Sequence, residues 1–190
     1  MQITDLTPED TTTIEQVALI LLDCFGHLPS GYPTFEEALE EVHESFTSDY
    51  PEGGSASHRI SRIAIDDSGT VLGWIGGIQQ YDGNVWELHP LIVKSDCRGQ
   101  GIGRLLVADL EVQARQRGGV TLWLGTDDED GKTTLSGINL YPNVWKHIAA
   151  IKNLRQHPYE FYQKCGFVIV GVMPDANGLG KPDIYMAKQL

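Results

Sequence analysis

A glycine-rich turn between an apolar run and a helical pattern constrains the fold of this 190-residue chain more than any other feature. The turn reads Arg98-Gly99-Gln100-Gly101-Ile102-Gly103 and follows the apolar run Leu91-Ile92-Val93. The residues after it place Ile102, Leu105, Leu106 and Leu110 on one helical face. The sequence therefore predicts a strand that enters a turn and continues directly into a helix.

An anionic ligand suits a turn of this kind. The first backbone N–H groups of the helix lack partners within the helix and point outward. Glycines let a ligand approach the main chain closely, and the helix dipole favours negative charge at this end. Arg98 and Arg104 add two cationic side chains. We therefore interpret the turn as a diphosphate-binding site.

The spacing of the glycines excludes two common phosphate-binding motifs. A mononucleotide loop would need Lys-Ser or Lys-Thr after Gly103, and a dinucleotide fingerprint would need Gly-x-Gly-x-x-Gly. What remains is Arg-x-x-Gly-x-Gly at Arg98, Gly101 and Gly103, which resembles the acetyl-coenzyme A pyrophosphate loop of the GNAT superfamily of N-acetyltransferases. The alternative interpretation is a tight turn with a glycine cap.

A second motif follows in the order that the superfamily has. The segment Tyr159–Phe167 predicts a short helix that ends at Gly166 and leads into the strand Val168–Val170. Tyr162 lies four residues before Gly166, and the superfamily carries a tyrosine at this distance before Gly-Phe or Gly-Tyr. The two motifs together identify the chain as similar to the GNAT superfamily.

From Trp86 to the C-terminus the chain resembles one branch more closely, the chromosomal aminoglycoside 6′-N-acetyltransferases of bacteria. The segments that carry this resemblance are Trp86–Leu91, Leu124–Asp128, Thr133–Ser136, His157–Tyr162, Ile169–Val172 and Lys181–Ile184.

The resemblance implies a fold and an activity. The fold class is α/β, a single acetyltransferase domain over residues 1–190, with a mixed, mostly antiparallel sheet flanked by helices and a splayed parallel strand pair. The activity is direct transfer of acetyl from acetyl-coenzyme A to the 6′-amine of an aminoglycoside in a ternary complex, which gives antibiotic resistance. It also implies a homodimer and a donor site made of Ile92, Val93, Arg98, Gly99, Gln100, Gly101, Ile102, Gly103 and Arg104.

The strand Val85–Val93 is expected to carry the chemistry. Side chains alternate along a strand, so Glu87 and His89 face the same way. Pro90 cannot donate to a ladder, so it is expected at a sheet edge or at a bulge, and a bulge here would push this strand away from the strand Val120–Gly125. In the resembling superfamily the pantetheine arm lies beside a bulged strand, which would leave the N–H of Leu91 or its neighbour to bind the thioester oxygen.

The reaction needs a group that removes a proton from the substrate ammonium. Glu87 is the first candidate because its carboxylate can attract the ammonium and accept the proton. His89 and a water molecule stay open as alternatives, and each side chain could instead have only a packing role. The family pattern gives Tyr162 the role of protonating or orienting the departing sulfur.

The charge of the chain points to a cationic acceptor. The formal net charge is −12, which argues against nucleic acid and favours a positively charged ligand, although acidity alone also serves solubility. Asp127, Asp128, Glu129 and Asp130 follow a predicted strand, Val120–Gly125. We expect Asp127 and Asp128 to contact substrate ammonium groups, the alternative being a solvated turn.

Other features set the class of protein. Hydrophobic residues make up 41% of the chain, and the N-terminal residues do not read as a signal peptide. The three cysteines are isolated and the six histidines scattered, which predicts no metal site and a reducing, cytoplasmic location. Further expected elements are the strand Gln2–Leu6, the helix Thr11–Phe25, a helix capped by Thr34, a hairpin over Ile60–Gln80, a helix over Val144–Leu154, and loops over Pro29–Pro33 and Asp49–Ser57.

Two other functions stay open at this point. One is an acetyltransferase for another amine, such as a polyamine or a protein N-terminus, because every donor motif would be the same. The other is a non-catalytic module that binds coenzyme A. Glu87 and Tyr162 argue against the second, because a binding module has no use for a base or for an acid at the sulfur.

Overall fold

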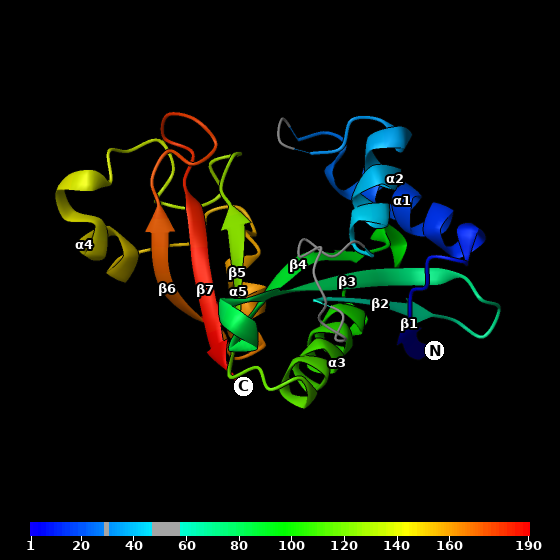
Figure 1. Ribbon diagram of the computed structural model, residues 1–190. Helices are drawn as coiled ribbons and strands as arrows, with labels where there is room; N and C mark the ends of the chain where they lie inside the picture. The colour runs from blue at the N-terminus through cyan, green and yellow to red at the C-terminus, as the bar shows by residue number, and fades with distance from the viewer. Residues whose placement is uncertain (29–30, 47–57) are drawn as a thin grey trace. The chain divides into compact units, whose positions relative to one another are not determined.

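The computed structural model describes residues 1–28, 31–46 and 58–190, which group into two compact units (Figure 1). Unit 1 contains Met1–Val120 and Leu190, and unit 2 contains Thr121–Gln189. The predicted loop Asp49–Ser57 and part of the loop Pro29–Pro33 lie outside the described residues.

Unit 1 is an antiparallel sheet with helices on both faces (Figure 1). Its strands lie in the order β1 (Gln2–Asp5), β2 (Arg59–Ile65), β3 (Val71–Gln80) and β4 (Val85–Val93). Helices α1 (Thr11–Phe25) and α2 (Phe35–Glu44) cover one face, and α3 (Ile102–Gln116) covers the other. The short 3-10 turns η1 (Tyr81–Gly83) and η2 (Ser95–Cys97) connect β3 to β4 and β4 to the glycine-rich turn.

Local sequence signals explain where the helices of unit 1 begin. Asp10 accepts a hydrogen bond from the N–H of Thr13, which caps α1. Thr34 and Glu37 form a reciprocal capping box at the start of α2, as expected from the threonine at this position. Behind these caps, Val17, Leu21 and Val42 are fully buried in one core cluster with the sheet residue Trp74.

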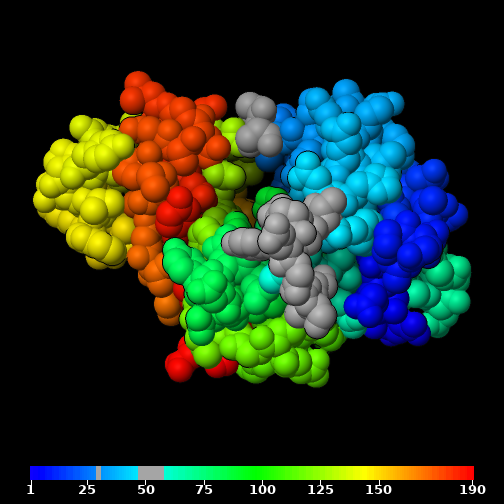
Figure 2. All heavy atoms as spheres, in the orientation of Figure 1, coloured from blue at the N-terminus to red at the C-terminus, as the bar shows by residue number. Residues whose placement is uncertain are grey.

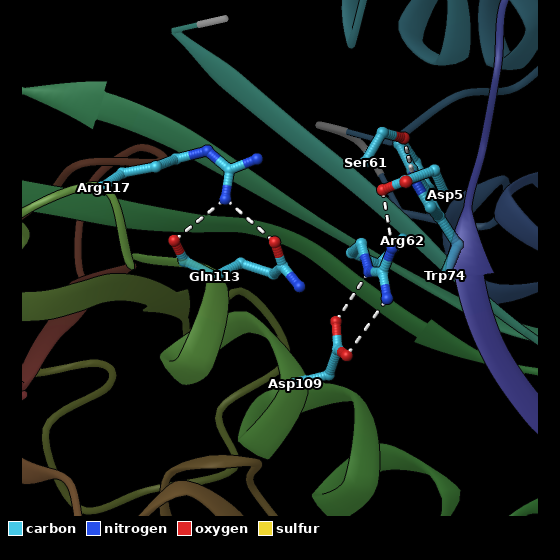
Figure 3. A network of polar contacts seen from close by, with 7 residues as sticks. All are labelled: Asp5, Ser61, Arg62, Trp74, Asp109, Gln113 and Arg117. Carbon is cyan, nitrogen blue, oxygen red and sulfur yellow. Dashed lines mark hydrogen bonds and ion pairs between the residues drawn. The ribbon is translucent and has the colours of Figure 1, made fainter. Parts of the chain in front are cut away.

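A partly buried arginine connects the sheet of unit 1 to helix α3 (Figure 3). Nε of Arg62 donates a hydrogen bond to Oδ2 of Asp109 at 2.7 Å, and Nη1 donates one to Oδ1 of Asp5 at 2.6 Å. A second nitrogen, Nη2, donates to the other oxygen of Asp109 at 3.2 Å. The fork geometry of the guanidinium thus fixes α3 relative to β1 and β2.

Unit 2 is a three-stranded antiparallel sheet in the order β5 (Thr121–Asp127), β7 (Asp183–Gln189) and β6 (Val168–Met173). Helix α4 (Val144–Ala149) follows the 3-10 turn η3 (Tyr141–Asn143) and contacts β6, and α5 (Tyr159–Lys164) contacts β7. No helix of the described ranges is long and apolar enough to cross a lipid bilayer.

Most predicted elements are confirmed, with two differences in unit 2. Strand β7 had no sequence prediction, and α4 ends at Ala149 rather than at Leu154. The chain after α4 pairs instead with the segment at Thr134: the Thr134 N–H donates to the carbonyl of Lys152 at 3.1 Å, and the Lys152 N–H donates to the Thr134 hydroxyl at 3.0 Å. These bonds replace the helical ones.

Candidate functional site

The glycine-rich turn has the open backbone that a diphosphate needs. Gly99 and Gly101 adopt left-handed φ values of 77° and 89°, which favour glycine. A Cβ atom added at either position would meet no atom within 4 Å, so space lies over the turn. Gly101 is the N-cap of α3, and among the described residues no side chain caps this helix. Its first N–H groups can therefore serve an anionic ligand.

Contacts within unit 1 hold the side chain of Arg98 beside this turn. Its Nε donates to the carbonyl of Val93 at 3.1 Å, and its Nη2 lies 3.1 Å from the Cys24 sulfur at the end of α1. Gln100 bonds back to the carbonyl of Asp96 at 3.3 Å. The predicted donor residues on the turn thus lie together on one strand–turn–helix segment.

Two of the predicted donor residues can act only through their backbone. The side chains of Ile92 and Ile102 are buried, with exposed fractions of 2% and 5%. Val93 is half-buried, and Gly103 and Arg104 follow in the first turn of α3. The apolar side chains anchor the turn in the core, and the backbone and Arg104 stay at the surface.

Strand β4 bulges at His89 and Pro90, as the proline predicts. Ile75 of β3 pairs with Leu91, and Gly77 pairs with Leu88, so Gly76 alone opposes two residues of β4. A Cβ atom on Gly76 would lie 2.1 Å from the carbonyl oxygen of His89. Gly76 therefore allows the bulge. Sequence reasoning missed this glycine, although the pair Gly76-Gly77 inside a strand was a usable signal.

Glu87 is a partly buried carboxylate beside the bulge. Its Oε2 accepts a hydrogen bond from the Gln80 amide at 2.5 Å. Loss of solvation raises the pKa of Glu87, while His89 and Gln80 favour its charged form. A carboxylate with a raised pKa is a better proton acceptor than one in water.

His89 lies on the same strand and faces helix α2. Its Nε2 is 3.5 Å from Oε1 of Glu41, and about half of its side-chain surface is exposed. The hydrogen bond to Glu41 raises the pKa of His89, and the nearby Glu87 charge acts in the same direction. The structure therefore gives the two predicted base candidates different surroundings.

In unit 2, the two predicted substrate carboxylates have different environments. Asp127 is exposed at the end of β5 and accepts a hydrogen bond from the Asn177 amide. Asp128 is fully buried. Its oxygens accept hydrogen bonds from the Lys132 N–H at 2.5 Å, the Thr133 N–H at 2.8 Å and the Thr133 hydroxyl at 2.7 Å. This corrects the expectation for Asp128, whose carboxylate shapes the loop after β5.

His157 connects the end of β5 to the start of α5. Its Nδ1 lies 3.2 Å from the N–H of Tyr159, which can only donate, so Nδ1 accepts. Its Nε2 then donates to the carbonyl of Asp127 at 3.0 Å. This arrangement needs the neutral ring, and burial lowers the pKa of His157 accordingly.

Tyr162 lies one turn further along α5 in an aromatic environment. Its ring contacts Phe161 and Phe167 edge-on, with ring centroids 5.1 and 5.8 Å away. Desolvation raises the pKa of Tyr162 far above its usual value, so the phenol keeps its proton. A protonated phenol suits the donation that the family pattern gives it.

Comparison with known proteins decides the family. The model of the acetyltransferase (GNAT) family matches residues 16–141. The chain belongs to the GNAT acetyltransferase family. The predicted α/β acetyltransferase fold is thereby confirmed.

Solved structures of this family resemble the chain over its whole length. An aminoglycoside 6′-N-acetyltransferase complexed with coenzyme A is 41% identical, with a TM-score of 0.88, covering 100% of this chain and 97% of that one. The aminoglycoside 6′-N-acetyltransferase from Enterococcus faecium is 42% identical, with a TM-score of 0.85 and the same coverage. An aminoglycoside 6′-acetyltransferase type Ii is 36% identical, with a TM-score of 0.72, again covering 100% and 97%. No curated protein sequence matches the chain significantly.

The bulge of strand β4 leads to a prediction about Gly76. Gly76→Ala should lower the free energy of unfolding by about 1–3 kcal/mol, because its Cβ would displace the backbone of His89. Gly171→Ala is the matched control, since it also lies in a strand and its Cβ would be 3.9 Å from the nearest atom. Urea unfolding measures both variants, and equal midpoints would show that the bulge does not need Gly76.

Proposed function

We propose that this protein transfers the acetyl group of acetyl-coenzyme A to the 6′-amine of an aminoglycoside, and so confers resistance to that antibiotic. The observation that carries the proposal is 41% identity, over the whole chain, to an aminoglycoside 6′-N-acetyltransferase complexed with coenzyme A. The open glycine turn before α3 supports the donor half, and the acidic character of the chain supports the cationic acceptor.

The donor is held by the strand–turn–helix segment. Backbone N–H groups of Gly99, Gly101 and Gly103 bind the pyrophosphate, and Arg98 and Arg104 neutralise its charge. The bulged strand leaves the N–H of Leu91 to donate to the thioester oxygen, which develops negative charge in the transition state. Bound acetyl-coenzyme A supplies an activated acetyl thioester, so no acyl-enzyme is required.

Proton transfers complete the reaction. Glu87 accepts one proton from the substrate ammonium and leaves a neutral amine. The amine nitrogen then forms a bond to the acetyl carbon, and the bond from that carbon to sulfur breaks. Tyr162 donates its phenolic proton to the thiolate and regains one from the acetylated nitrogen through solvent. The net products are the amide, the free thiol and one proton.

The acceptor is expected to be polycationic. Glu87 and the exposed Asp127 each offer a carboxylate to an ammonium group, and the net charge of −12 attracts such ligands over longer range. Asp128 contributes indirectly by ordering the loop that follows Asp127. No metal takes part in this proposal, because every step is an acid–base or acyl transfer between the named groups.

Release of thiol from acetyl-coenzyme A tests the proposal. Aminoglycosides with a 6′-amine should release thiol, whereas matched sugars with a 6′-hydroxyl, a linear polyamine and a peptide N-terminus should give little signal. Equal turnover of the 6′-amine and 6′-hydroxyl sugars would contradict the proposed position of attack. A signal only with the polyamine or the peptide would favour the other acetyltransferase functions.

The same assay tests the acceptor contact. Asp127→Asn should raise the KM for the aminoglycoside by about tenfold and leave the KM for acetyl-coenzyme A nearly unchanged, because one charge-assisted contact is lost. Glu129→Gln is the control, since it removes a neighbouring charge that the proposal does not use. Equal effects of both variants would reduce the role of Asp127 to general electrostatics.

We also propose a single cytoplasmic domain that forms a homodimer. All three cysteines are free thiols, which suits a reducing compartment. Strand β6 ends the sheet of unit 2 and exposes Val168, Val170 and Met173. Helix α4 contacts β6 and exposes Trp145, and η3 exposes Tyr141; in Figure 2 the yellow surface of α4 lies beside the orange surface of β6. Apolar edge strands are usually covered by a partner. Light scattering after gel filtration should give the dimer mass, and a monomer at micromolar concentration would contradict this.

A further inference from the structure

The charged groups of unit 1 around the bulge form a cluster that extends beyond Glu87 and His89. Helix α2 contributes Glu41, which is 18% exposed and lies 3.5 Å from Nε2 of His89. The phenol of Tyr32 donates a hydrogen bond to the same carboxylate. Among the described residues, Arg59 of β2 acts on Glu41 and His89, and Glu44 of α2 acts on Tyr32.

The pKa values of the two carboxylates in this cluster are shifted in opposite directions. The hydrogen bond from His89 lowers the pKa of Glu41, and the bond from Tyr32 and the charge of Arg59 lower it further. Burial raises the pKa of Glu87. Pairs of carboxyl groups with diverging pKa values commonly have different roles in one reaction. The surroundings of Glu41 thus favour its anion, whereas burial makes Glu87 the carboxylate that takes up a proton more readily.

His89 interacts with both of these carboxylates. Its Nε2 must carry a hydrogen to face the Glu41 anion, and the charge of Glu87 also favours the imidazolium. An imidazolium has no lone pair with which to accept a proton. The positive charge of His89 does, however, stabilise the charged form of Glu87, which burial of Glu87 disfavours.

We propose that Glu41 is a positioning residue, which holds His89 as an imidazolium against helix α2 so that Glu87 alone accepts the proton of the attacking ammonium. This role rests on the proposed function, since it concerns the base of that reaction. It selects Glu87 as the base from the three candidates that the sequence leaves open, which are Glu87, His89 and water. It also gives α2 a part in the chemistry that is separate from its packing.

The first test follows the titration of His89 by NMR and needs no substrate. Imidazole signals of the wild type are followed against pH, and the spectrum of His89→Gln identifies the signal of His89 among the six histidines. Glu41→Gln should move the titration of His89 to lower pH. Glu40→Gln is the matched control, because it removes an exposed carboxylate from the neighbouring position of the same helix. An unchanged titration of His89 in Glu41→Gln overturns the proposal.

The second test measures kcat/KM against pH with a 6′-amino aminoglycoside. Loss of Glu41 makes the imidazolium form of His89 less stable, and the pKa of Glu87 rises because less positive charge faces it. The acid limb of the profile should therefore move to higher pH in Glu41→Gln. Glu87→Gln should lower kcat at least about 100-fold, and His89→Gln by no more than about tenfold. Equal losses in Glu87→Gln and His89→Gln overturn the proposal.

Two further features keep the tests decisive. Glu41→Asp keeps the charge but shortens the side chain, so it should fold where Glu41→Gln does not, and should shift the titration of His89 in the same direction. If no aminoglycoside is acetylated, the proposed function fails, and the NMR result still decides whether Glu41 controls the charge of His89. An unchanged titration in Glu41→Asp, in the absence of folded Glu41→Gln, overturns the proposal.

Discussion

The approach of Gly76 to the carbonyl of His89 is the contact on which the arrangement of strand β4 depends. It lets two residues of β4 oppose one residue of β3, and this turns the strand out of its regular ladder. Glu87 lies before the irregularity, and Leu91 and the glycine turn lie after it. The proposed base, the proposed oxyanion donor and the donor loop therefore depend on one backbone contact that only glycine permits.

Electrostatics then divides the work among groups that have similar chemistry. Glu41 and Glu87 are both carboxylates near His89, yet hydrogen bonds stabilise the charge of one and burial disfavours the charge of the other. The same distinction appears in unit 2. Asp128 is buried and accepts hydrogen bonds from its own loop, whereas its neighbour Asp127 is exposed. Residue type alone therefore does not determine which acid contacts a ligand and which one shapes the protein.

The sequence predicted what local patterns determine. The glycine turn, the Thr34 cap, the hairpin and the bulge at Pro90 all follow from residues close together in the chain. Gly76 and Glu41 were missed because their roles arise from strand pairing and helix packing, which bring distant residues together. The early end of α4 has the same cause, since Lys152 bonds to Thr134. The burial of Asp128 was missed because a turn of acidic residues also suits solvent.

The most direct test of the account is calorimetry of acetyl-coenzyme A binding to two glycine variants at the ends of helix α3. Gly101 and Gly118 have φ values of 89° and 85°, and a Cβ on either would meet nothing within 4 Å. Gly101→Val and Gly118→Val therefore impose the same backbone strain, but only the first fills the space proposed for the pyrophosphate. The account predicts that Gly101→Val weakens binding at least about tenfold, or about 1.4 kcal/mol, and that Gly118→Val binds like the wild type. Undiminished affinity in Gly101→Val, or equal losses in both variants, would contradict it.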